Sequence, residues 1–535
     1  MKFDDFGFDD LVIWRSGNWR CRVSGYTIHQ SPNPKSPNSR GSAFVATIWI
    51  IAALTGLTLI LANTVRVEIL ASANRLAQLQ ADAAARGAEQ FVLAAVDAEV
   101  ASPGSVTSAT SGIDMEAISI GDAYVWIIKP DPDDETAISF GLTDEASKLD
   151  LNNALNVQLQ LLPNMTSQNA DCIVDWRTPG NTSSPEGAKD PTYLAPDDGR
   201  PPYHCKSAPF ETVEELQLVY SITPDLLWGV DYTRSGHVDP NDNAPAMTTD
   251  LTPGASVSNR GIFPFVTVYG VKAATVPSST SSSSSLSRSL TGSNSRGSGS
   301  PGLSNSGTVN VNDSNSANLT NLLQQFLGSS APEVLRLTQD RLSNRQPFAS
   351  IWDWAITVNI TSAQFSQIFS RVTASPVVVA SGSSTVAPTA VAKINVNTAP
   401  SQVLLTIPNI EQSDVDAITT HRQNNPDPTD PSDISWLLDV IPKNKLLIIG
   451  DFITGVSYCY SADILACSHD GRAFTRTRIV VDASSGTAQI IYRRDMSAFG
   501  WPLDPQIRED LRAGKPLQTN AMGLMKGNNT GGMMP

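Results

Sequence analysis

The histidines and serines of this sequence are not spaced as enzymes space them. The five histidines lie far apart, and none belongs to an HExxH pair that would bind zinc; they stand at positions 29, 204, 237, 421 and 469. The many serines include no GxSxG turn, in which a nucleophilic serine would lie beside a general base. The sequence therefore predicts no enzymatic activity.

Four of the five cysteines follow the long apolar segment described below. An even number of cysteines in an oxidising compartment favours two disulfides, which we expect to join Cys172 to Cys205 and Cys459 to Cys467. The second pair requires a bend in the chain, because positions eight apart on one straight strand cannot meet. Buried free thiols are the alternative for both pairs.

Carboxylates gather around the first of these cysteines. Asp171 and Asp175 flank Cys172, and Asp190 follows a Gly-Ala-Lys turn shortly afterwards. Oxygen ligands clustered on one loop suit Ca²⁺, which takes six to eight of them. We therefore predict a calcium site at Asp171, Asp175 and Asp190. Solvated acids in turns are the alternative interpretation.

A single apolar segment dominates the N-terminal part of the chain. The twenty residues from Ala43 to Ala62 carry no charge, and as a helix they span about 30 Å, the thickness of a bilayer's hydrocarbon core. No proline interrupts the chain between this segment and Pro103, so we predict one helix over residues 42–100. Lys35 and Arg40 precede the segment, which predicts a cytoplasmic N-terminus with the bulk of the chain outside the cytoplasm. A signal anchor followed by a separate helix is the alternative.

Strand patterns appear early and late in the remaining chain. Residues 124–128 and 137–142 are strand-like runs, and three antiparallel strands are expected at residues 457–466, 473–482 and 488–494. Asp470-Gly471 and Ser485-Gly486 would form the hairpin turns between the last three. Between these regions, residues 276–316 are rich in serine and poor in large apolar residues, which predicts a disordered loop.

Charge composition argues against a nucleic-acid-binding protein. The 535 residues include 37 Lys plus Arg and 52 Asp plus Glu, a net charge of −15. Such a surface repels phosphate backbones, so no nucleic-acid partner is expected.

Several motifs together carry a resemblance to a family. Arg40-Gly41-Ser42 before a long uncharged helix resembles the processing site of type IV prepilins and pseudopilins, in which a membrane peptidase cuts after the glycine. LTDEASKLDLNNA, residues 142–154, resembles a DEAGKINLN segment of the protein K family of type II secretion systems, and KINVNTAPSQVLLTIPNIEQSDVDAITTHR, residues 393–422, resembles a second hallmark of that family. The pseudopilin glutamate at the fifth position after the cut is replaced by Ala46, an absence that also resembles protein K.

The resemblance implies an α+β fold: a long N-terminal transmembrane helix packed on a small antiparallel sheet, with a large α-rich inserted domain. The implied segments are a leader at 1–41, the helix at 42–100, early strands at 105–150, the insertion at 151–442, last strands at 450–498 and a C-terminal tail at 499–535. Gly41 and Ser42 would form the cleavage site. In protein K the stretch matching Asp175-Trp176 and Asp190 contributes to calcium binding, but Lys189 here replaces a glutamate of that motif, which should weaken the affinity.

The function implied is that of a non-enzymatic minor pseudopilin in the inner membrane, which caps and initiates the pseudopilus for export of folded proteins from the periplasm. Its implied partners are the prepilin peptidase, inner-membrane lipid, minor pseudopilins I and J, minor pseudopilin H and the major pseudopilin.

A type IV pilus minor pilin and a membrane-anchored helix-hairpin-helix DNA-uptake protein are the alternatives. The stretch Pro408-Asn409-Ile410-Glu411 lacks the glycines with which such hairpins bind phosphate, and Asp414 and Asp416 add negative charge. The motif is therefore expected to serve packing.

Overall fold

A computed structural model describes residues 40–103, 114–131, 134–135, 137–196, 201–238, 260–270, 308–313, 317–374, 391–425, 430–515 and 517. Most of the predicted leader and most of the predicted serine-rich loop lie outside these residues. The chain divides into two compact units, Met1–Leu70 and Ala71–Pro535.

Helix α1 (Arg40–Ala101) is unbroken over 62 residues, as the absence of proline predicted. Nearly all side chains between residues 43 and 70 are exposed, although most of them are apolar. Among the described residues, α1 is the one helix long and apolar enough to cross a membrane.

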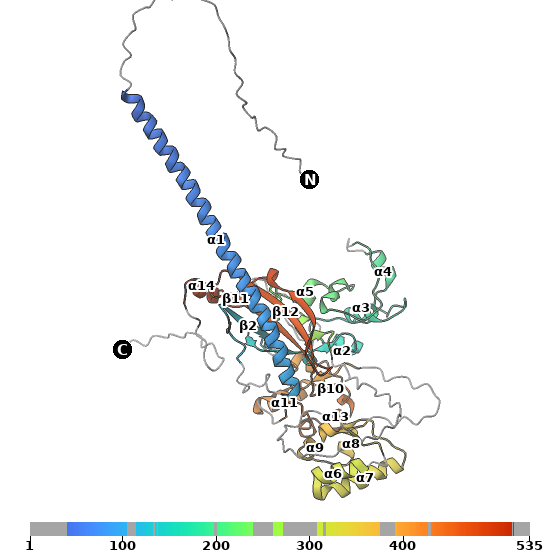
Figure 1. Cartoon of the computed structure of the whole chain (residues 1–535). Helices are drawn as coiled ribbons and strands as arrows, with labels where there is room; N and C mark the ends of the chain where they lie inside the picture. Colours follow the sequence, from blue (N-terminus) through green and yellow to red (C-terminus); the bar gives the residue numbers. More distant parts are fainter. Residues whose placement is uncertain are drawn as a thin grey trace, which may run out of the picture. The chain divides into compact units, whose positions relative to one another are not determined.

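In the second unit, α1 packs on one face of a seven-stranded sheet (Figure 1). The helix contributes a row of buried alanines, which bring its backbone close to the strands; they are Ala77, Ala81, Ala84, Ala85 and Ala88. The strands run in the order β1-β2-β11-β12-β13, with β3 beside β2 and β4 beside β11, and every pair is antiparallel. Their bounds are β1 Ile118–Ile120, β2 Ala123–Pro130, β3 Ile138–Phe140, β4 Thr143–Asp144, β11 Cys459–Ser468, β12 Phe474–Asp482 and β13 Gln489–Asp495.

The three last strands lie close to their predicted positions. Gly471 and Gly486, in the two predicted hairpin turns, have φ angles of 64° and 91°. These left-handed conformations are the reason for glycine in each turn. The predicted α+β class, with its long apolar helix and antiparallel sheet, is confirmed.

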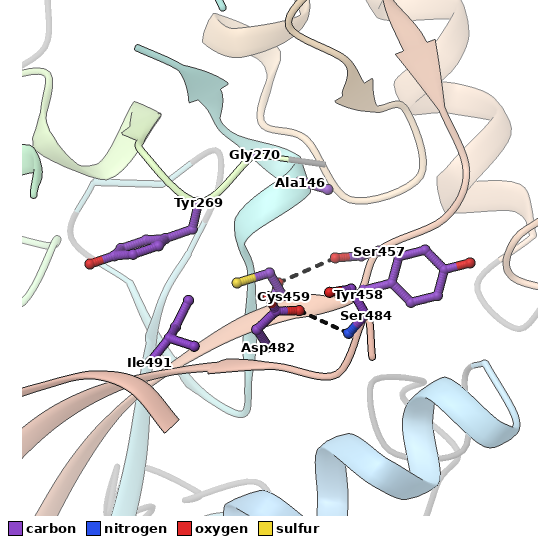
Figure 2. A pocket seen from close by; sticks show the side chains of 9 residues that line it. All are labelled: Ala146, Tyr269, Gly270, Ser457, Tyr458, Cys459, Asp482, Ser484 and Ile491. Carbon is purple, nitrogen blue, oxygen red and sulfur yellow. Dashed lines mark hydrogen bonds between the residues drawn. The ribbon is translucent and has the colours of Figure 1, made fainter. Parts of the chain in front are cut away.

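The inserted domain leaves the sheet after β4 and returns at β11, whose residues Tyr460 and Ser461 pair with β4. This junction lies beside the C-terminal end of α1, where the Asp97 carboxylate accepts a 2.7 Å hydrogen bond from the Ala488 N–H. A small hollow at the junction is lined by residues from both regions, including Tyr269, Cys459 and Ile491 (Figure 2). Measured by strand pairing, the insertion therefore runs from about residue 145 to about residue 458, beyond the predicted limits of 151–442 at both ends.

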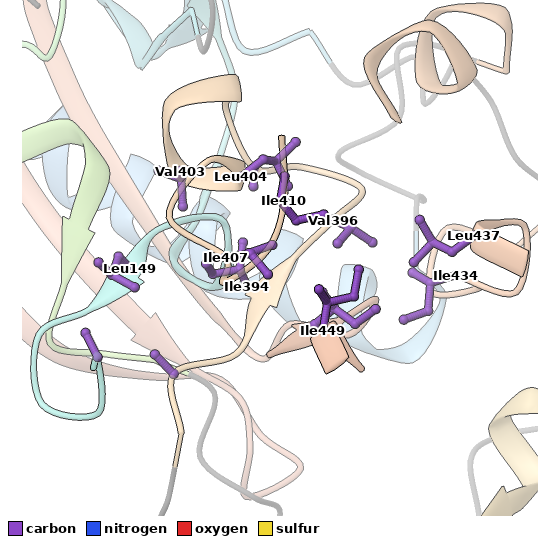
Figure 3. Close-up of a cluster of buried hydrophobic side chains, with 14 of the residues drawn as sticks. Leu149, Ile394, Val396, Val403, Leu404, Ile407, Ile410, Ile434, Leu437 and Ile449 are labelled. Carbon is purple, nitrogen blue, oxygen red and sulfur yellow. The ribbon is translucent and has the colours of Figure 1, made fainter. Parts of the chain in front are cut away.

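In the described residues, short helices and three two-stranded parallel sheets build the inserted domain around an apolar core. Figure 3 shows part of this core. The paired strands are β5 (Leu149–Asp150) with β6 (Val266–Thr267), β7 (Val309–Asn310) with β8 (Val372–Thr373), and β9 (Ile394–Asn395) with β10 (Ile453–Thr454). The α-helices are α2 Asn156–Gln160, α3 Ser167–Arg177, α4 Asp190–Leu194, α5 Pro224–Trp228, α6 Ala317–Leu327, α7 Ala331–Ser343, α8 Ile351–Thr357, α9 Ser362–Ser366, α10 Ser401–Leu404, α11 Gln412–Asn424, α12 Leu437–Val440 and α13 Lys443–Ile449. Strand β7 falls within the predicted serine-rich loop, so that loop was drawn too long at its C-terminal end.

The segment after β13 folds onto the sheet, which corrects the prediction of a tail beginning at residue 499. Trp501 and Leu511 are buried against the face opposite α1, with Trp126 from β2. Helix α14 (Pro505–Arg512) supplies Leu511 and begins with Pro505 in its first turn.

Candidate functional site

The exposed half of α1 presents a surface suited to lipid. Its large apolar side chains are exposed to about half or more, as Trp49 at 72% illustrates. The four threonine hydroxyls of this half each donate to a backbone carbonyl three or four residues earlier; they are Thr47, Thr55, Thr58 and Thr64. These side chains thus bring no unpaired hydroxyl donor into a bilayer. The sequence interpretation missed these hydrogen bonds. They could have been expected, because a threonine in a helix can donate to the backbone carbonyl of the preceding turn.

Small residues interrupt this apolar surface. A Cβ atom added at Gly56 would meet nothing within 4 Å, and Ala46 is exposed. Close approach of a second helix in lipid needs such small residues. This half of α1 therefore has the length and the surface of a single-pass anchor that can also pack against other helices.

The predicted cleavage site lies in the first turn of α1. Gly41 and Ser42 follow Arg40, the first residue of the helix. The first four N–H groups of a helix have no partner within it, so this turn can unwind at low cost into the extended form that a protease binds. No observation tests the cleavage, which stays a prediction.

Two of the predicted calcium ligands lie on α3. The carboxylate oxygens of Asp171 accept hydrogen bonds from Asn156 Nδ2 at 2.7 Å and from the Glu186 N–H at 3.1 Å. Asp175 is buried and accepts from the backbone N–H and the hydroxyl of Ser184, both at 2.9 Å. Both side chains therefore fasten residues 184–186 to α3.

The third predicted ligand points to a different segment. Asp190 begins α4 and accepts 2.8 Å and 3.1 Å bonds from the Cys205 N–H and from His204 Nδ1. The hydrogen bond from His204 is the main cause that lowers the pKa of Asp190.

Lys189, directly before Asp190, turns its ammonium towards the end of α3. Its side chain is buried, with 2% of the residue exposed, and its ammonium donates to the carbonyl oxygens of Asp175 and Thr178. The sequence interpretation saw Lys189 only as a substitution that weakens calcium binding. Its inward direction could not be read from the pattern, because the same turn could also have held it in solvent.

The residues present do not fit a calcium ion. Both oxygens of each predicted carboxylate already accept hydrogen bonds from the chain, and the Lys189 ammonium occupies the carbonyl oxygens of Asp175 and Thr178. In the part of the chain that the structure describes, no three His, Cys, Asp or Glu side chains are grouped closely enough to hold a metal. Asp197 and Asp198, which follow in the sequence, lie outside that part.

The predicted Cys459–Cys467 disulfide is wrong. The two residues lie at opposite ends of β11, where eight residues of strand separate them by roughly 27 Å. The bend that the pairing required is absent, because β11 pairs continuously with β12 from Cys459 to Cys467. Burial raises the pKa of the Cys467 thiol to about 12, so this residue is an unreactive part of the core.

Cys172 and Cys205 are both buried and are free thiols in the structure. Cys172 Sγ lies 3.7 Å from the Glu186 carbonyl oxygen, and Cys205 Sγ lies 3.9 Å from that of Asp175. Burial is the main cause that raises the pKa of Cys172 to about 11, and Cys205 is among the charges that add to it. Both thiols belong to the core of the inserted domain, and their disulfide stays a prediction.

The hairpin between α10 and α11 uses its polar groups internally. Ile407 and Ile410 are buried, and Asn409 turns the chain with a φ of 64°. The ammonium of Lys445 contacts Glu411 and Asp414 at 3.1 Å and 2.7 Å. This hairpin presents the acids predicted from its sequence, and its contacts are those of a packing element.

A buried ion pair that the sequence did not reveal joins the inserted domain to the sheet. Asp463 on β11 contacts Arg476 at 2.6 Å and Arg478 at 2.8 Å, and Arg476 also donates to the Thr233 carbonyl oxygen of the insertion at 2.6 Å. Burial alone would raise the pKa of Asp463, but the two guanidinium groups outweigh it and lower that pKa.

Two comparisons with known proteins found a similarity: one with a family model and one with a solved complex. Residues 136–229 match the family model described as type II secretion system (T2SS), protein K. A chain of the crystal structure of the GspK–GspI–GspJ complex from the type 2 secretion system of enterotoxigenic Escherichia coli is similar over 78% of this chain and 96% of that chain, with 10% identity and a TM-score of 0.35. No curated protein matches the sequence.

Proposed function

We propose that the chain is a minor pseudopilin of the protein K family of the type II secretion system, and that it caps the tip of the pseudopilus and initiates its assembly. Its role is structural, as a component of the machine that exports folded proteins. The observation that carries the proposal is the position of the inserted domain at the C-terminal end of α1.

The inserted domain covers the end of the sheet where the next subunit of a filament would have to pack. The insertion leaves and rejoins the sheet at β4 and the start of β11. The same end holds Ala488, which is bonded to Asp97 in the last turns of α1. A domain of about 300 residues attached there excludes another subunit stacked beyond it. Subunits could then be added only at the opposite end of the sheet.

The exposed half of α1 supports the proposed partners. An apolar helix with Ala46, Ala53 and Gly56 on its surface can exchange lipid contacts for contacts with similar helices. We expect minor pseudopilins I and J to supply the first of these helices. Minor pseudopilin H and the major pseudopilin would follow as the filament grows.

The proposed site of action is the inner membrane, with the N-terminus in the cytoplasm and the inserted domain in the periplasm. Lys35 and Arg40, which precede the apolar segment, support this topology. The prepilin peptidase would cut between Gly41 and Ser42 and leave α1 in the bilayer.

Labelling of assembled pseudopili tests the tip position. The full-length protein, produced with its secretion system and marked by an antibody, should appear at one end of each filament. A labelled major pseudopilin serves as the control and should mark the whole shaft. Label of this chain along the shaft would refute the cap. Detergent extracts should also contain this chain together with minor pseudopilins I and J.

N-terminal sequencing of the membrane-extracted protein tests processing. The mature chain should begin at Ser42, and Gly41→Leu should accumulate as precursor, because a side chain hinders entry into the peptidase. Gly56→Leu, a matched change farther along α1, should be processed normally. A chain that keeps residues 1–41 in secreting cells would contradict the assignment of the cleavage site.

The proposed periplasmic location of the inserted domain also supports the Cys172–Cys205 disulfide as a proposal. Peptide mapping of unreduced protein from the membrane should recover these two cysteines linked. It should recover no link between Cys459 and Cys467.

A further inference from the structure

Lys189 is an unusual residue to find inside the inserted domain. Lysine is almost never fully buried unless its charge is paired, because its ammonium loses hydration that must be replaced. Here the residue is 2% exposed and lies at the N-terminus of α4, and its side chain reaches back towards the end of α3. The loop between α3 and α4 therefore holds a buried positive charge, which needs partners inside the protein.

The partners of that charge are the carbonyl oxygens at the C-terminus of α3. The ammonium donates to the Thr178 oxygen at 2.6 Å and to the Asp175 oxygen. The last carbonyls of a helix lack N–H partners and carry the negative end of its dipole, so they attract a cation. Backbone carbonyl oxygens of this kind are also ligands that Ca²⁺ takes.

The neighbouring carboxylates already accept hydrogen bonds from donors of the chain. Ser184 binds the Asp175 carboxylate through both its N–H and its hydroxyl, and the Glu186 N–H binds Asp171. Gly187 makes this approach possible, because a Cβ atom there would lie 1.9 Å from Asp175 Oδ2. The loop between α3 and α4 thus closes on the helix through protein donors alone.

We infer that the ammonium of Lys189 replaces a divalent cation in this loop, so that residues 178–190 hold their conformation without metal. The inference concerns the inserted domain and does not depend on the position of the chain in the filament. In the family motif that this loop resembles, a glutamate stands at the position of Lys189. The exchange of an acid for a cation would then convert a metal-dependent loop into a metal-independent one.

Hydrogen exchange of the full-length protein in detergent, followed by mass spectrometry, tests the inference. Peptides from residues 167–205 report on the loop, and peptides from β11 and β12 report on overall folding. The wild type should exchange equally in EDTA and in millimolar Ca²⁺. Lys189→Met should exchange roughly ten- to hundredfold faster in the loop alone, with or without Ca²⁺, because it loses hydrogen bonds to a charged group.

Lys189→Glu provides the decisive comparison. It should exchange fast in EDTA and regain protection in Ca²⁺, because the glutamate restores an acidic ligand and frees the two carbonyl oxygens. Lys515→Met, which removes an exposed lysine paired with Asp510, is the control and should leave the loop unchanged. Loosening of the wild type by EDTA, wild-type exchange in Lys189→Met, or no effect of Ca²⁺ on Lys189→Glu would each overturn the inference.

Discussion

On one face of the seven-stranded sheet, alternate residues of β11 such as Ala462 and Ile464 pack against the alanine row of α1. On the other face, the intervening residues include Asp463 and Leu465, which meet the inserted domain and the segment around Trp501. The same strand therefore faces an apolar helix on one side and a buried ionic contact on the other. Side chains of a strand alternate between faces, so one sequence can serve both.

The two faces of the sheet differ in how strictly their contacts fix the geometry of the element packed on them. Close helix packing on small residues is tolerant of rotation but sensitive to added volume. The contact between Asp463, Arg476 and the Thr233 carbonyl oxygen requires one geometry, because a buried charge without its partner is costly. Such a contact can fix the orientation of an inserted domain, which an apolar surface alone does poorly.

Loss of the buried carboxylate should have the largest effect. Asp463→Asn leaves Arg476 and Arg478 without their counter-charge, and we expect the free energy of unfolding to fall by about 3–5 kcal/mol. Urea unfolding of the full-length protein in detergent measures this change. Asp470→Asn, which removes a surface pair with Arg472, is the control and should cost at most about 1 kcal/mol. Equal stability of Asp463→Asn and wild type would contradict the contrast between the faces.

Acid should abolish the same contribution. The folded protein holds the pKa of Asp463 below its usual value, so this group stabilises the fold above about pH 4, its approximate pKa in the unfolded chain. The stability is lost as the pH falls through the lower pKa of the folded state. The difference in unfolding free energy between wild type and Asp463→Asn should thus be constant near neutrality and shrink in acid. A difference that grows in acid would show that burial, which raises the pKa, prevails.

On the α1 face, added volume should have an intermediate effect. Ala88 is fully buried, and Ala88→Leu should lower the unfolding free energy by about 1–3 kcal/mol because the helix must move away from the strands. Ala83, on the exposed side of the same helix, is the matched control. Its change to Leu should alter stability by about 0.5 kcal/mol or less. Equal effects at both positions would mean that α1 does not pack on the sheet through Ala88.

Periodicity predicted the elements of the sheet better than their contacts. The uncharged run from Ala43 and the absence of proline gave α1, and alternation with glycine turns gave β11, β12 and β13. Asp463 interrupts an apolar run, and Lys189 lies in a polar turn. Neither pattern predicts burial, because each side chain is buried only by contacts with residues distant in the sequence. Helix α14 was missed because Leu511 finds its partners far away in the sequence. The cleavage site stays a prediction.

The smallest effect is expected from the ion pair on the α1 face, between Glu89 and Arg493. Its N–O distance of 2.8 Å equals that between Arg478 and Asp463, but the Arg493 side chain is 52% exposed. Water already solvates that guanidinium, so Glu89→Gln should cost only about 0.2–1 kcal/mol. Salt should remove this small difference and leave that of Asp463→Asn almost unchanged, because buried pairs are screened less. Urea unfolding at low and high ionic strength measures the stability change of both variants. A large loss of stability in Glu89→Gln that persists at high salt would show that buried ion pairs stabilise both faces of the sheet.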